Sequence, residues 1–520
     1  MLLKDLLTTL SVAETTEGEF DVRGGSASSI NVEITSLNYD SRQVLAGSAF
    51  VAIRGYKSDG HDFIDNAVAN GAVAVLCETF PVLIPEEGKC IYVKVSDTRI
   101  ALAELSKAFY GNASDNLVII GVTGTNGKTT TATLIQSILE AGGMKTGLIG
   151  TIAYHIGDEK IVASRTTPEA LELHQLFARM LKQGCTAVVM EVSSHALFLK
   201  RTHGIRFAVA VFTNLTQDHL DFHGTMENYF AAKKILFDSL DQNATAITNT
   251  DDEYGLPIVT DTKAVVMTYA AEETMDSLTD PPPELHTVKS GADVLAKVFS
   301  YKLDGTTAII SHNGISMMHH FKLIGKFNVY NMLAAYCTGA ALGINRVDII
   351  RGLIKNDGVR GRMEQVWSKD NRCAIVDYAH TPDALLSVIR SIKQIKPSEG
   401  KLITVFGCGG DRDRTKRPEM GRIAEAESDI VILTSDNPRT EDPEKILDDI
   451  EAGMSRAEQF YRIADREQAI RKGITLLGRG DVVLVAGKGH ETYQEVNGEK
   501  QRFDDREVIE RIFHEQEGLI

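Results

Sequence analysis

A lysine and two threonines, Lys128-Thr129-Thr130, close a glycine-rich stretch that begins at Gly121. An apolar run precedes the stretch, and a helical pattern over 132–141 follows it. Backbone N–H groups at a helix N-terminus, together with the helix dipole, attract phosphate groups. In such a loop the lysine reaches the β- and γ-phosphates, and the next hydroxyl holds Mg²⁺. The stretch therefore predicts a nucleoside triphosphate site made by Gly124, Thr125, Asn126, Gly127, Lys128, Thr129 and Thr130.

The glycine spacing differs from that of the usual phosphate-binding loop. The pattern G-x-x-x-x-G-K-[ST] requires glycine where this chain has Val122, and glycine stands instead at 121, 124 and 127. An ordinary glycine-rich turn between a strand and a helix is the alternative interpretation. The order of strand, Gly-Lys-Thr and helix favours the phosphate site.

Polar residues follow two further apolar runs. Glu191 and Ser193 come directly after 187–190, and His219 follows 207–212. Apolar runs this continuous are typical of parallel strands covered on both faces. Ligands bind beyond the carboxyl ends of such strands, so we expect the three motifs to converge beside one nucleotide.

The elements that must position these residues form three predicted domains. Residues 1–111 contain three short strands and three helices, and the last helix ends at a Gly-Asn stop signal. Residues 112–355 carry the phosphate loop, and residues 356–520 repeat the order of apolar run, polar motif and helix. The predicted fold class is α/β, with a small N-terminal α/β domain, a central P-loop ATPase-like parallel-sheet domain and a C-terminal Rossmann-like domain.

Local signals predict two further features of the central domain. The segment 276–293 contains three consecutive prolines and little periodicity, so we expect an exposed loop there. A helix over 332–342 is expected to end at Gly343, and Asn328 or Asn331 could cap its start.

Composition limits the class of protein. The chain has 520 residues, of which 43% are hydrophobic and 24% charged, so it is ordinary globular material but too long for one core. Its net charge of −16 argues against a nucleic-acid partner. A solvated acidic surface is the simpler interpretation of that charge.

The expected location is the cytoplasm. The six cysteines are scattered, mostly in apolar runs, which predicts small buried residues in a reducing compartment. The first ten residues form an amphipathic helix rather than a signal peptide. No apolar run approaches the ~18 residues that span a bilayer. We therefore expect a cytoplasmic monomer with no membrane partner.

Four segments resemble the Mur ligases of peptidoglycan synthesis. They are 123–130, 191–195 (Glu-Val-Ser-Ser-His), 213–221 (Thr-Asn-Leu-Thr-Gln-Asp-His-Leu-Asp) and 231–234 (Ala-Ala-Lys-Lys). The resemblance covers nearly the whole chain, and in this family the phosphate loop has the glycine spacing found here. The motifs Asp-Tyr-Ala-His-Thr-Pro at 377–382 and Asp-Asn-Pro-Arg at 436–439 are similar to those of members that add diaminopimelate.

The resemblance implies an ATP-dependent, ADP-forming acid–amino-acid ligase. The D-glutamate side-chain carboxylate of UDP-N-acetylmuramoyl-L-alanyl-D-glutamate would attack the γ-phosphate of ATP. The amine of meso-diaminopimelate would then attack the acyl phosphate. Because an anion approaches an anion in the first step, charge neutralisation and positioning are the main tasks. Lys128 and two Mg²⁺ ions would supply the positive charge.

The resemblance also implies roles for individual residues. Thr129 and Glu191 would hold one Mg²⁺, and His219 with Lys233 the other. An ammonium has no lone pair, and the resemblance implies that Lys233 is carbamylated and binds the ion through a carbamate oxygen. From the sequence pattern alone, Lys233 would be interpreted as a lysine on the surface of a helix. The remaining roles, carried over by position, are Asn331, Arg362 and Asp377 for ATP; Ser41, Tyr56, Lys57, Ser58, Thr166, Thr167, Ser193 and Arg201 for the UDP-linked substrate; and Arg412, Asp436, Asn437, Pro438, Arg439, Gly487 and Glu491 for diaminopimelate.

Arg439 carries the predicted choice of amino acid. A planar guanidinium grips a carboxylate through two hydrogen bonds, and lysine lacks the distal carboxylate of diaminopimelate. Lysine-adding relatives typically lack this arginine, and a surface salt bridge is the alternative interpretation of it. Three alternatives for the whole chain stay open: a lysine-adding ligase, a folylpolyglutamate synthetase-like ligase and a non-catalytic nucleotide-binding module.

Overall fold

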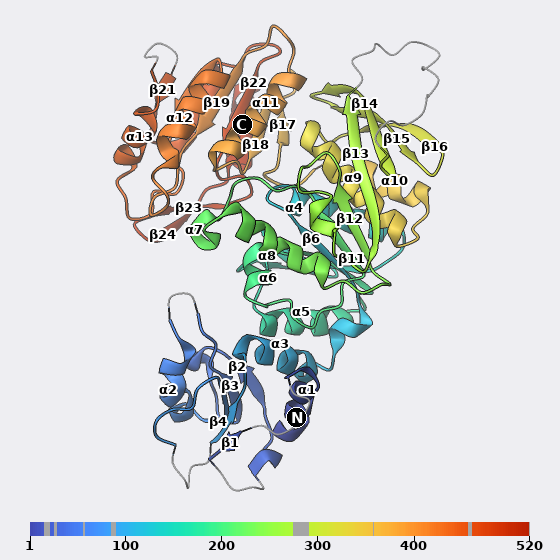
Figure 1. Cartoon of the computed structure of the whole chain (residues 1–520). Helices are drawn as coiled ribbons and strands as arrows, with labels where there is room; N and C mark the ends of the chain where they lie inside the picture. The colour runs from blue at the N-terminus through green and yellow to red at the C-terminus, as the bar shows by residue number, and fades with distance from the viewer. Residues whose placement is uncertain are drawn as a thin grey trace. The chain divides into compact units, whose positions relative to one another are not determined.

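Two compact α/β units make up the protein (Figure 1). The first unit comprises residues 1–269 and 334–352, and the second comprises 270–333 and 353–520. The computed structural model describes residues 1–14, 21–24, 29–55, 58–84, 90–273, 291–356, 358–455 and 460–518. Tyr56 and Lys57 therefore lie outside the described residues, as does most of the predicted loop 276–293.

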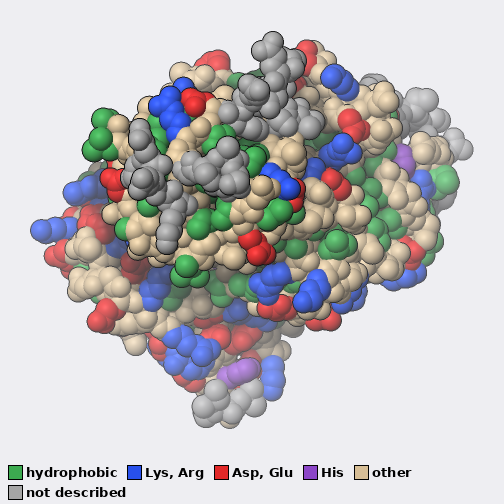
Figure 2. All heavy atoms as spheres, turned by 90° about the horizontal axis from the view of Figure 1, so that it is seen from below, with side chains coloured by type: hydrophobic (Ala, Val, Ile, Leu, Met, Phe, Trp, Pro, Cys, Tyr) green, Lys and Arg blue, Asp and Glu red, His purple; other side chains and the backbone are tan. Residues whose placement is uncertain are grey.

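The surface carries charges of both signs. Figure 2 shows Lys and Arg side chains interspersed with Asp and Glu side chains over the face in view. All six cysteines fall in described parts of the chain, and each is a buried free thiol, as predicted. Among the helices of the described residues, none is long and apolar enough to cross a membrane.

A small sheet near the N-terminus has the strand order β1-β5-β4-β3-β2. Its four strands β2 to β5 are mutually parallel, and β1 runs antiparallel to β5. Helices α1 and α3 pack on one face and α2 on the other. The predicted strands and helices are all present. The bounds are α1 Leu3–Glu14, β1 Val22–Arg23, β2 Ser36–Asn38, β3 Ser48–Val51, α2 Ile64–Ala69, β4 Ala72–Cys77, β5 Ile91–Lys94 and α3 Thr98–Phe109.

The larger sheet of the first unit has the order β13-β12-β11-β6-β10-β7-β8-β9. The strands from β13 to β7 are parallel, and β8 and β9 are antiparallel additions. Since β6 lies between β10 and β11, the three predicted motifs do end side by side. The bounds are β6 Val118–Thr123, β7 Thr146–Ile149, β8 Ala153–Ile156, β9 Glu159–Val162, β10 Ala187–Glu191, β11 Val209–Phe212, β12 Thr245–Asn249 and β13 Val265–Glu273.

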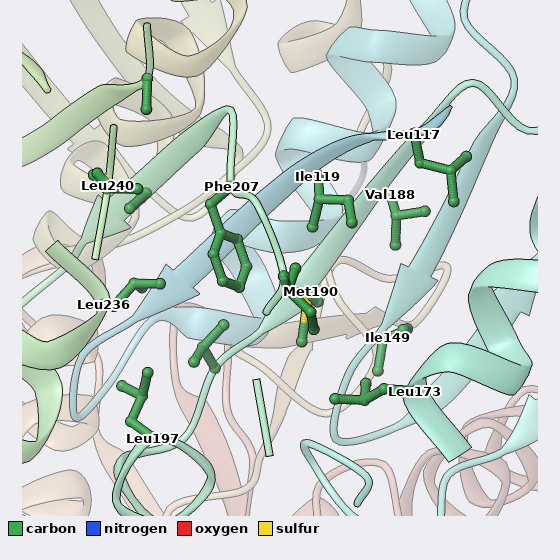
Figure 3. Close-up of a cluster of buried hydrophobic side chains, with 14 of the residues drawn as sticks. Leu117, Ile119, Ile149, Leu173, Val188, Met190, Leu197, Phe207, Leu236 and Leu240 are labelled. Atoms are coloured by element: carbon green, nitrogen blue, oxygen red, sulfur yellow. The ribbon is translucent and has the colours of Figure 1, made fainter. Parts of the chain in front are cut away.

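The core of this sheet is a hydrophobic cluster on one of its faces. Figure 3 shows Ile119, Val188 and Met190 from the central strands together with Leu173 and Leu236. The last two belong to helices α5 (Ala170–Lys182) and α8 (Met226–Asp238). Successive strand residues point to opposite faces, so their neighbours face α4 (Lys128–Ala141), which contacts β6, β7 and β10. The central strands are therefore covered on both faces, as their continuous apolar runs predict.

The second unit contains a doubly wound sheet, as predicted. Its order is β17-β18-β22-β19-β20-β21, all parallel except β17. Helices α11, α12 and α13 cover one face, and α14 and α15 cover the other. The bounds are β17 Glu364–Trp367, β18 Cys373–Asp377, α11 Pro382–Ile395, β19 Leu402–Phe406, α12 Lys416–Glu427, β20 Ile430–Leu433, α13 Pro443–Glu451, β21 Phe460–Arg462, α14 Arg466–Thr475, β22 Val482–Ala486 and α15 Asp505–Gln516.

The structure differs from the predicted elements in two respects. Helix α9 (Lys326–Ala341) begins before the predicted 332, so Asn328 and Asn331 lie inside it and do not cap it. Besides β1, β2, β7, β8, β9, β12, β13, β17 and β21, whose bounds are given above, five further strands went unpredicted. They are β14 Val294–Lys302, β15 Gly305–His312, β16 Ile315–Phe321, and the hairpin of β23 Tyr493–Val496 and β24 Glu499–Arg502. These five strands range from mostly buried (β14 and β15) to fully exposed (β24).

Candidate active site

The glycine-rich loop joins β6 to α4 and needs glycine at its first turn. Gly124 has a φ of +146°, and a Cβ there would lie 1.9 Å from the hydroxyl oxygen of Thr213. The segment after β11 thus approaches the loop too closely for a side chain. Helix α4 starts at Lys128, earlier than the predicted pattern, which places Thr129 and Thr130 in its first turn.

Hydrogen bonds from the segment after β11 hold the loop. Asn126 donates its N–H to Oδ1 of Asn214 at 3.0 Å, and Nδ2 of Asn214 donates to the carbonyl of Asn126 at 3.0 Å. The Thr213 hydroxyl donates to the same carbonyl at 2.6 Å. The N–H of Thr125 donates to the carbonyl of Asn214 at 2.8 Å. The loop is therefore shaped by the protein itself, before any ligand binds.

Lys128 is folded against this loop. Its Nζ donates to the carbonyl oxygens of Gly124 at 2.9 Å and Thr125 at 2.7 Å. The ammonium is thus held beside the loop that is expected to bind phosphates.

Glu191 ends β10 and is 1% exposed. Its Oε2 accepts hydrogen bonds from the hydroxyls of Thr129 at 3.0 Å and Thr151 at 3.1 Å. Its Oε1 accepts from the N–H of Thr151 at 2.9 Å. A carboxylate beside a hydroxyl offers the hard oxygen ligands that Mg²⁺ prefers. These residues fit one Mg²⁺ that takes its other ligands from phosphate and water.

The described residues contain no group of three or more His, Cys, Asp or Glu side chains arranged to hold a metal ion. A Mg²⁺ at a phosphate loop does not require one, because substrate phosphates and water complete its coordination.

Lys233 is buried on α8, with 1% of its surface exposed. Its Nζ donates to the carbonyl of Gly124 at 2.8 Å and lies 4.6 Å from the ring centroid of Tyr229. Burial, reinforced by the charge of Lys128, lowers the pKa of Lys233 well below its usual value. The interpretation of this residue as a helix-surface lysine is therefore wrong. Sequence spacing could not show the burial, because the contact is made by a distant loop.

His219 belongs to a group of aromatic side chains beside Lys233. Its ring lies 4.8 Å from that of His195 and 6.1 Å from that of Tyr229. Burial lowers the pKa of His219; the Asp218 carboxylate opposes this shift, and Lys128 and Lys233 add to it. Burial likewise lowers the pKa of His195 to about 4. His195, to which the sequence assigned no role, is thus packed against a predicted metal ligand.

Four of the residues predicted to bind the UDP-linked substrate lie together beside Glu191. The Thr167 hydroxyl donates to the carbonyl of Glu191 at 2.8 Å and accepts from the N–H of Ser193 at 3.0 Å. Nη1 of Arg201 donates to the carbonyl of Thr167 at 2.9 Å. The hydroxyls of Thr166 and Thr151 lie 3.1 Å apart. This group is therefore hydrogen-bonded to Glu191 and Thr151, the same residues that form the candidate Mg²⁺ site.

Ser41 and Ser58 are held separately. Ser41 is buried, and its carbonyl accepts from Nδ2 of Asn70 at 2.9 Å. The carbonyl of Ser58 accepts from the N–H of Gly55 at 2.9 Å. Within the described ranges, no hydrogen bond links either serine to the Thr167 group.

Glu169 is a residue that sequence reasoning missed. It is 6% exposed and lies among three arginines. Its carboxylate is 2.7 Å from Nε of Arg201, 3.0 Å from Nη1 of Arg165 and 3.8 Å from Nη1 of Arg99. Three guanidinium groups around one carboxylate leave a local excess of positive charge, which suits an anionic substrate. Of these three pairs, only the one between Arg165 and Glu169 could be anticipated from the sequence, because the two residues are four positions apart.

In the second unit, the predicted diaminopimelate residues lie at the carboxyl ends of β20 and β22. Nδ2 of Asn437 donates to Oε2 of Glu491 at 2.8 Å. A Cβ on Gly487 would lie 3.8 Å from the Asp436 carboxylate, so these two residues are also adjacent. The structure thus brings together Asp436 with Gly487 and Asn437 with Glu491.

Arg439 lies in the same region with a φ of +52°. Its Nη1 donates to the carbonyl of Gly410 at 2.7 Å, and its Nε is 3.4 Å from Oε2 of Glu495. A Cβ on Gly409 would lie 3.0 Å from Nη1 of Arg439 and 3.7 Å from Cγ of Arg412. The two predicted arginines therefore flank one glycine.

Pro438 contributes its backbone. A Cβ on Gly410 would lie 1.9 Å from the Pro438 carbonyl oxygen, so the two loops that carry Arg412 and Arg439 pack without a side chain between them.

Sequence reasoning also missed Lys488 and the β23–β24 hairpin. Nζ of Lys488 donates to Oδ1 of Asn437 at 3.0 Å. The hairpin donates the N–H of Glu495 to the same oxygen at 3.0 Å, and the N–H of Arg439 donates to the carbonyl of Glu495 at 3.0 Å. The available signal was the position of Lys488 in the sequence, next to Gly487 and three residues before Glu491, both of which were predicted to bind the amino acid.

The residues predicted on the ATP side lie in the second unit. The Asp377 carboxylate ends β18 and accepts from the N–H groups of Met363 at 2.7 Å and Ala379 at 2.8 Å. Burial raises the pKa of Asp377, and the charge of Arg362 opposes this shift. The guanidinium of Arg362 lies 4.8 Å from the ring centroid of Tyr378. Nδ2 of Asn331 donates to Oδ1 of Asn328 at 3.0 Å inside α9.

The strand, glycine-rich loop and helix around Lys128, together with the doubly wound sheet of the second unit, define an α/β protein of several domains whose loop has the form of a phosphate-binding loop. Three family descriptions match the chain: "Mur ligase family, catalytic domain" over residues 33–110, "Mur ligase middle domain" over 122–339 and "Mur ligase, glutamate ligase domain" over 361–489. The chain therefore belongs to the Mur ligase family.

Individual relatives show which members of the family this chain is similar to. The chain is 50% identical over 492 residues to the UDP-N-acetylmuramoyl-L-alanyl-D-glutamate–2,6-diaminopimelate ligase of Chlorobaculum tepidum, covering 94% of both chains. A solved structure of a ligase with that name is 34% identical, with a TM-score of 0.66, and covers 93% of this chain and 95% of its own. A folylpolyglutamate synthase structure from Thermotoga maritima is 18% identical with a TM-score of 0.56, covers 75% of this chain and 90% of its own, and shows similarity of fold alone.

Proposed function

We propose that the protein is an ATP-dependent, ADP-forming ligase of peptidoglycan precursor synthesis. It joins meso-diaminopimelate to the D-glutamate side-chain carboxylate of UDP-N-acetylmuramoyl-L-alanyl-D-glutamate through an acyl phosphate. The observation that carries the proposal is the convergence of Thr129, Glu191 and Lys233 on one phosphate loop. The proposal is also supported by three relatives, each named as a UDP-N-acetylmuramoyl-L-alanyl-D-glutamate–2,6-diaminopimelate ligase, that match nearly the whole chain.

The first step needs positive charge where two anions meet. The N–H groups of the loop 124–130 and the Lys128 ammonium bind the phosphates of ATP. Thr129 and Glu191 would hold a Mg²⁺ ion, which would neutralise phosphate charge. Asn331, Arg362 and Asp377 bind the nucleoside of ATP. The enzyme thus lowers the barrier by positioning and electrostatics.

An ammonium at Lys233 could not ligate a metal, because it has no lone pair. In the structure its Nζ donates to the carbonyl of Gly124. Burial favours the neutral amine, which has a lone pair. That lone pair attacks the carbon of CO₂, the nitrogen loses one proton, and a carbamate with a negative charge forms. The carbamate and His219 would offer ligands to a second Mg²⁺.

The two organic substrates use different residues. Thr166, Thr167, Ser193 and Arg201, with Ser41, Tyr56, Lys57 and Ser58, bind the UDP-linked dipeptide. Arg439 and Arg412 bind the carboxylates of diaminopimelate, and Asp436 and Glu491 face its ammonium groups. Asn437, Pro438 and Gly487 complete that pocket.

Three domains carry these tasks: residues 1–111 for the UDP-linked substrate, 112–355 for ATP and 356–520 for the amino acid. The enzyme works in the cytoplasm as a monomer, where UDP-linked precursors and reduced thiols coexist. It needs no nucleic acid or membrane.

Phosphate release tests the proposal. Purified protein, ATP, Mg²⁺ and the UDP-linked dipeptide are offered meso-diaminopimelate, L-lysine or L-ornithine in parallel. We expect release with diaminopimelate only. Release with lysine but not diaminopimelate would refute the specificity, and release with none of the three would refute the function.

A further inference from the structure

Lys488 is completely buried beneath the pocket proposed for the amino acid, with 0% of its surface exposed. Its Nζ lies 3.0 Å from Oδ1 of Asn437, 3.2 Å from Oε2 of Glu491 and 3.7 Å from Oδ1 of Asp436. One ammonium therefore contacts three residues assigned to the amino acid. Burying an ammonium is costly unless it is paired and hydrogen-bonded. Two roles of the Lys488 ammonium toward the three side chains that it contacts follow from the geometry.

The first role is to orient the Asn437 amide. Its oxygen accepts from two donors, Nζ of Lys488 and the N–H of Glu495, both at 3.0 Å. Reversing the amide would place its NH₂ group against these two donors. The NH₂ group must therefore face Glu491, to whose Oε2 it donates at 2.8 Å. Lys488 and the N–H of Glu495 thus together determine which side of the Asn437 amide is the donor.

The second role is charge balance. Asp436 and Glu491 place two carboxylates around the same ammonium. Oδ1 of Asp436 is buried and accepts no hydrogen bond from the part of the chain that is described. Without Lys488 the two carboxylates would repel each other at low dielectric. The Asp436 and Glu491 carboxylates would then move apart from their present positions.

We propose that Lys488 is a positioning residue for the amino-acid substrate. Because it is fully buried, it acts through Asn437 and Glu491 and does not bind the substrate from solvent. It holds these two side chains, and with them Asp436, in the arrangement that receives the ammonium end of the amino acid. This inference rests on the proposed function, since it assumes that these three residues bind the amine substrate.

Steady-state kinetics of Lys488→Met and Lys488→Gln test the proposal. Both changes remove the charge, and glutamine retains a hydrogen-bond donor. The KM for diaminopimelate should rise at least about tenfold in Lys488→Met, as expected when a hydrogen bond to a charged group is lost. Lys488→Gln should show a smaller rise. The KM values for ATP and for the UDP-linked dipeptide should not change in either variant.

Lys472→Met is the matched control. Lys472 belongs to the same unit, and its Nζ lies 4.4 Å from the Tyr461 ring centroid, as Nζ of Lys488 lies 5.6 Å from that of Tyr493. The control should leave all three KM values unchanged. If Lys488→Met does not fold, the glutamine variant decides the question.

Three results separate the possibilities. An unchanged KM for diaminopimelate in both Lys488 variants overturns the inference. A parallel rise in all three KM values also overturns it, because that pattern shows general damage to the fold. Failure of the wild-type protein to use diaminopimelate in the same assay refutes the proposed function itself.

Discussion

Lys233 donates a hydrogen bond to the carbonyl of Gly124 at 2.8 Å across 109 residues of sequence. A buried amine with a lowered pKa thus contacts the loop that is proposed to bind ATP. An uncompensated buried ammonium would be costly, so the contact favours a lysine that is used as a neutral nucleophile. The carbamate hypothesis follows from this relationship.

Replacing Lys233 with alanine should reduce kcat by at least about 10²-fold, as loss of one preorganised electrostatic group does in other enzymes. The matched control is Lys234→Ala, because Lys234 is the next residue on α8 and pairs at the surface with Asp238 and Asp261. Phosphate release measures both. The control should retain wild-type kcat.

Carbon dioxide provides a second readout for Lys233. Wild-type activity should fall in CO₂-free buffer and return when bicarbonate is added, whereas Lys233→Ala should not respond. Full wild-type activity after exhaustive removal of CO₂ would contradict the carbamate.

Replacing Glu169 with glutamine should raise the KM for the UDP-linked dipeptide several-fold. The carboxylate holds Arg201 at 2.7 Å and Arg165 at 3.0 Å. Without its charge, the like-charged guanidinium groups should move apart and lose the arrangement that receives an anion. Initial rates at varied dipeptide concentration measure the effect, and the KM for ATP should not change.

Glu159→Gln is the control for Glu169, because Glu159 makes an exposed ion pair with Arg179 at 3.0 Å. Such pairs contribute little. A lower KM in Glu169→Gln would mean that the carboxylate only opposes substrate binding, and would disprove a positioning role.

Replacing Arg439 with alanine should raise the KM for diaminopimelate by about 10²-fold, since a bidentate guanidinium–carboxylate pair is lost. The KM for ATP should change far less. Arg439→Lys keeps the charge but not the planar fork, so it should recover only part of the affinity. Equal effects of Arg439→Ala on the KM for diaminopimelate and the KM for ATP would show that Arg439 does not bind diaminopimelate.

His174 makes stability depend on pH. Both of its ring nitrogens are buried without a hydrogen-bond partner among the described residues, and burial lowers its pKa from 6.5 to about 4. The unfolded chain therefore takes up the proton first as pH falls. The folded state loses stability between pH 6.5 and about 4, by up to about 3 kcal/mol for a shift of this size.

His174→Leu should reduce that loss, because leucine does not titrate and leaves no polar atom unpaired. Urea unfolding of both proteins at several pH values measures the free energy of unfolding. Parallel pH dependences for the two proteins would show that His174 does not contribute.

Sequence patterns predicted the buried central strands and the motifs at their ends, because continuous apolar runs and glycine-rich turns are local signals. The phosphate loop, Glu191 and the Asp436–Arg439 motif therefore lie at strand ends as expected. Short and sheet-edge strands such as β2, β9 and β24 lack such runs and were missed. The burial of Lys233 and Lys488 and the arginines around Glu169 could not be predicted. Each depends on side chains that are distant in sequence, and a lysine or glutamate carries no local sign of burial.

The acyl phosphate tests the central claim most directly. The UDP-linked dipeptide, labelled with ¹⁸O in the side-chain carboxylate of D-glutamate, is incubated with ATP, Mg²⁺, meso-diaminopimelate and the protein. Mass spectrometry then follows the label. The proposed mechanism predicts an amide product that has lost one ¹⁸O and released phosphate that carries it. Unlabelled phosphate, or no amide product, would contradict it.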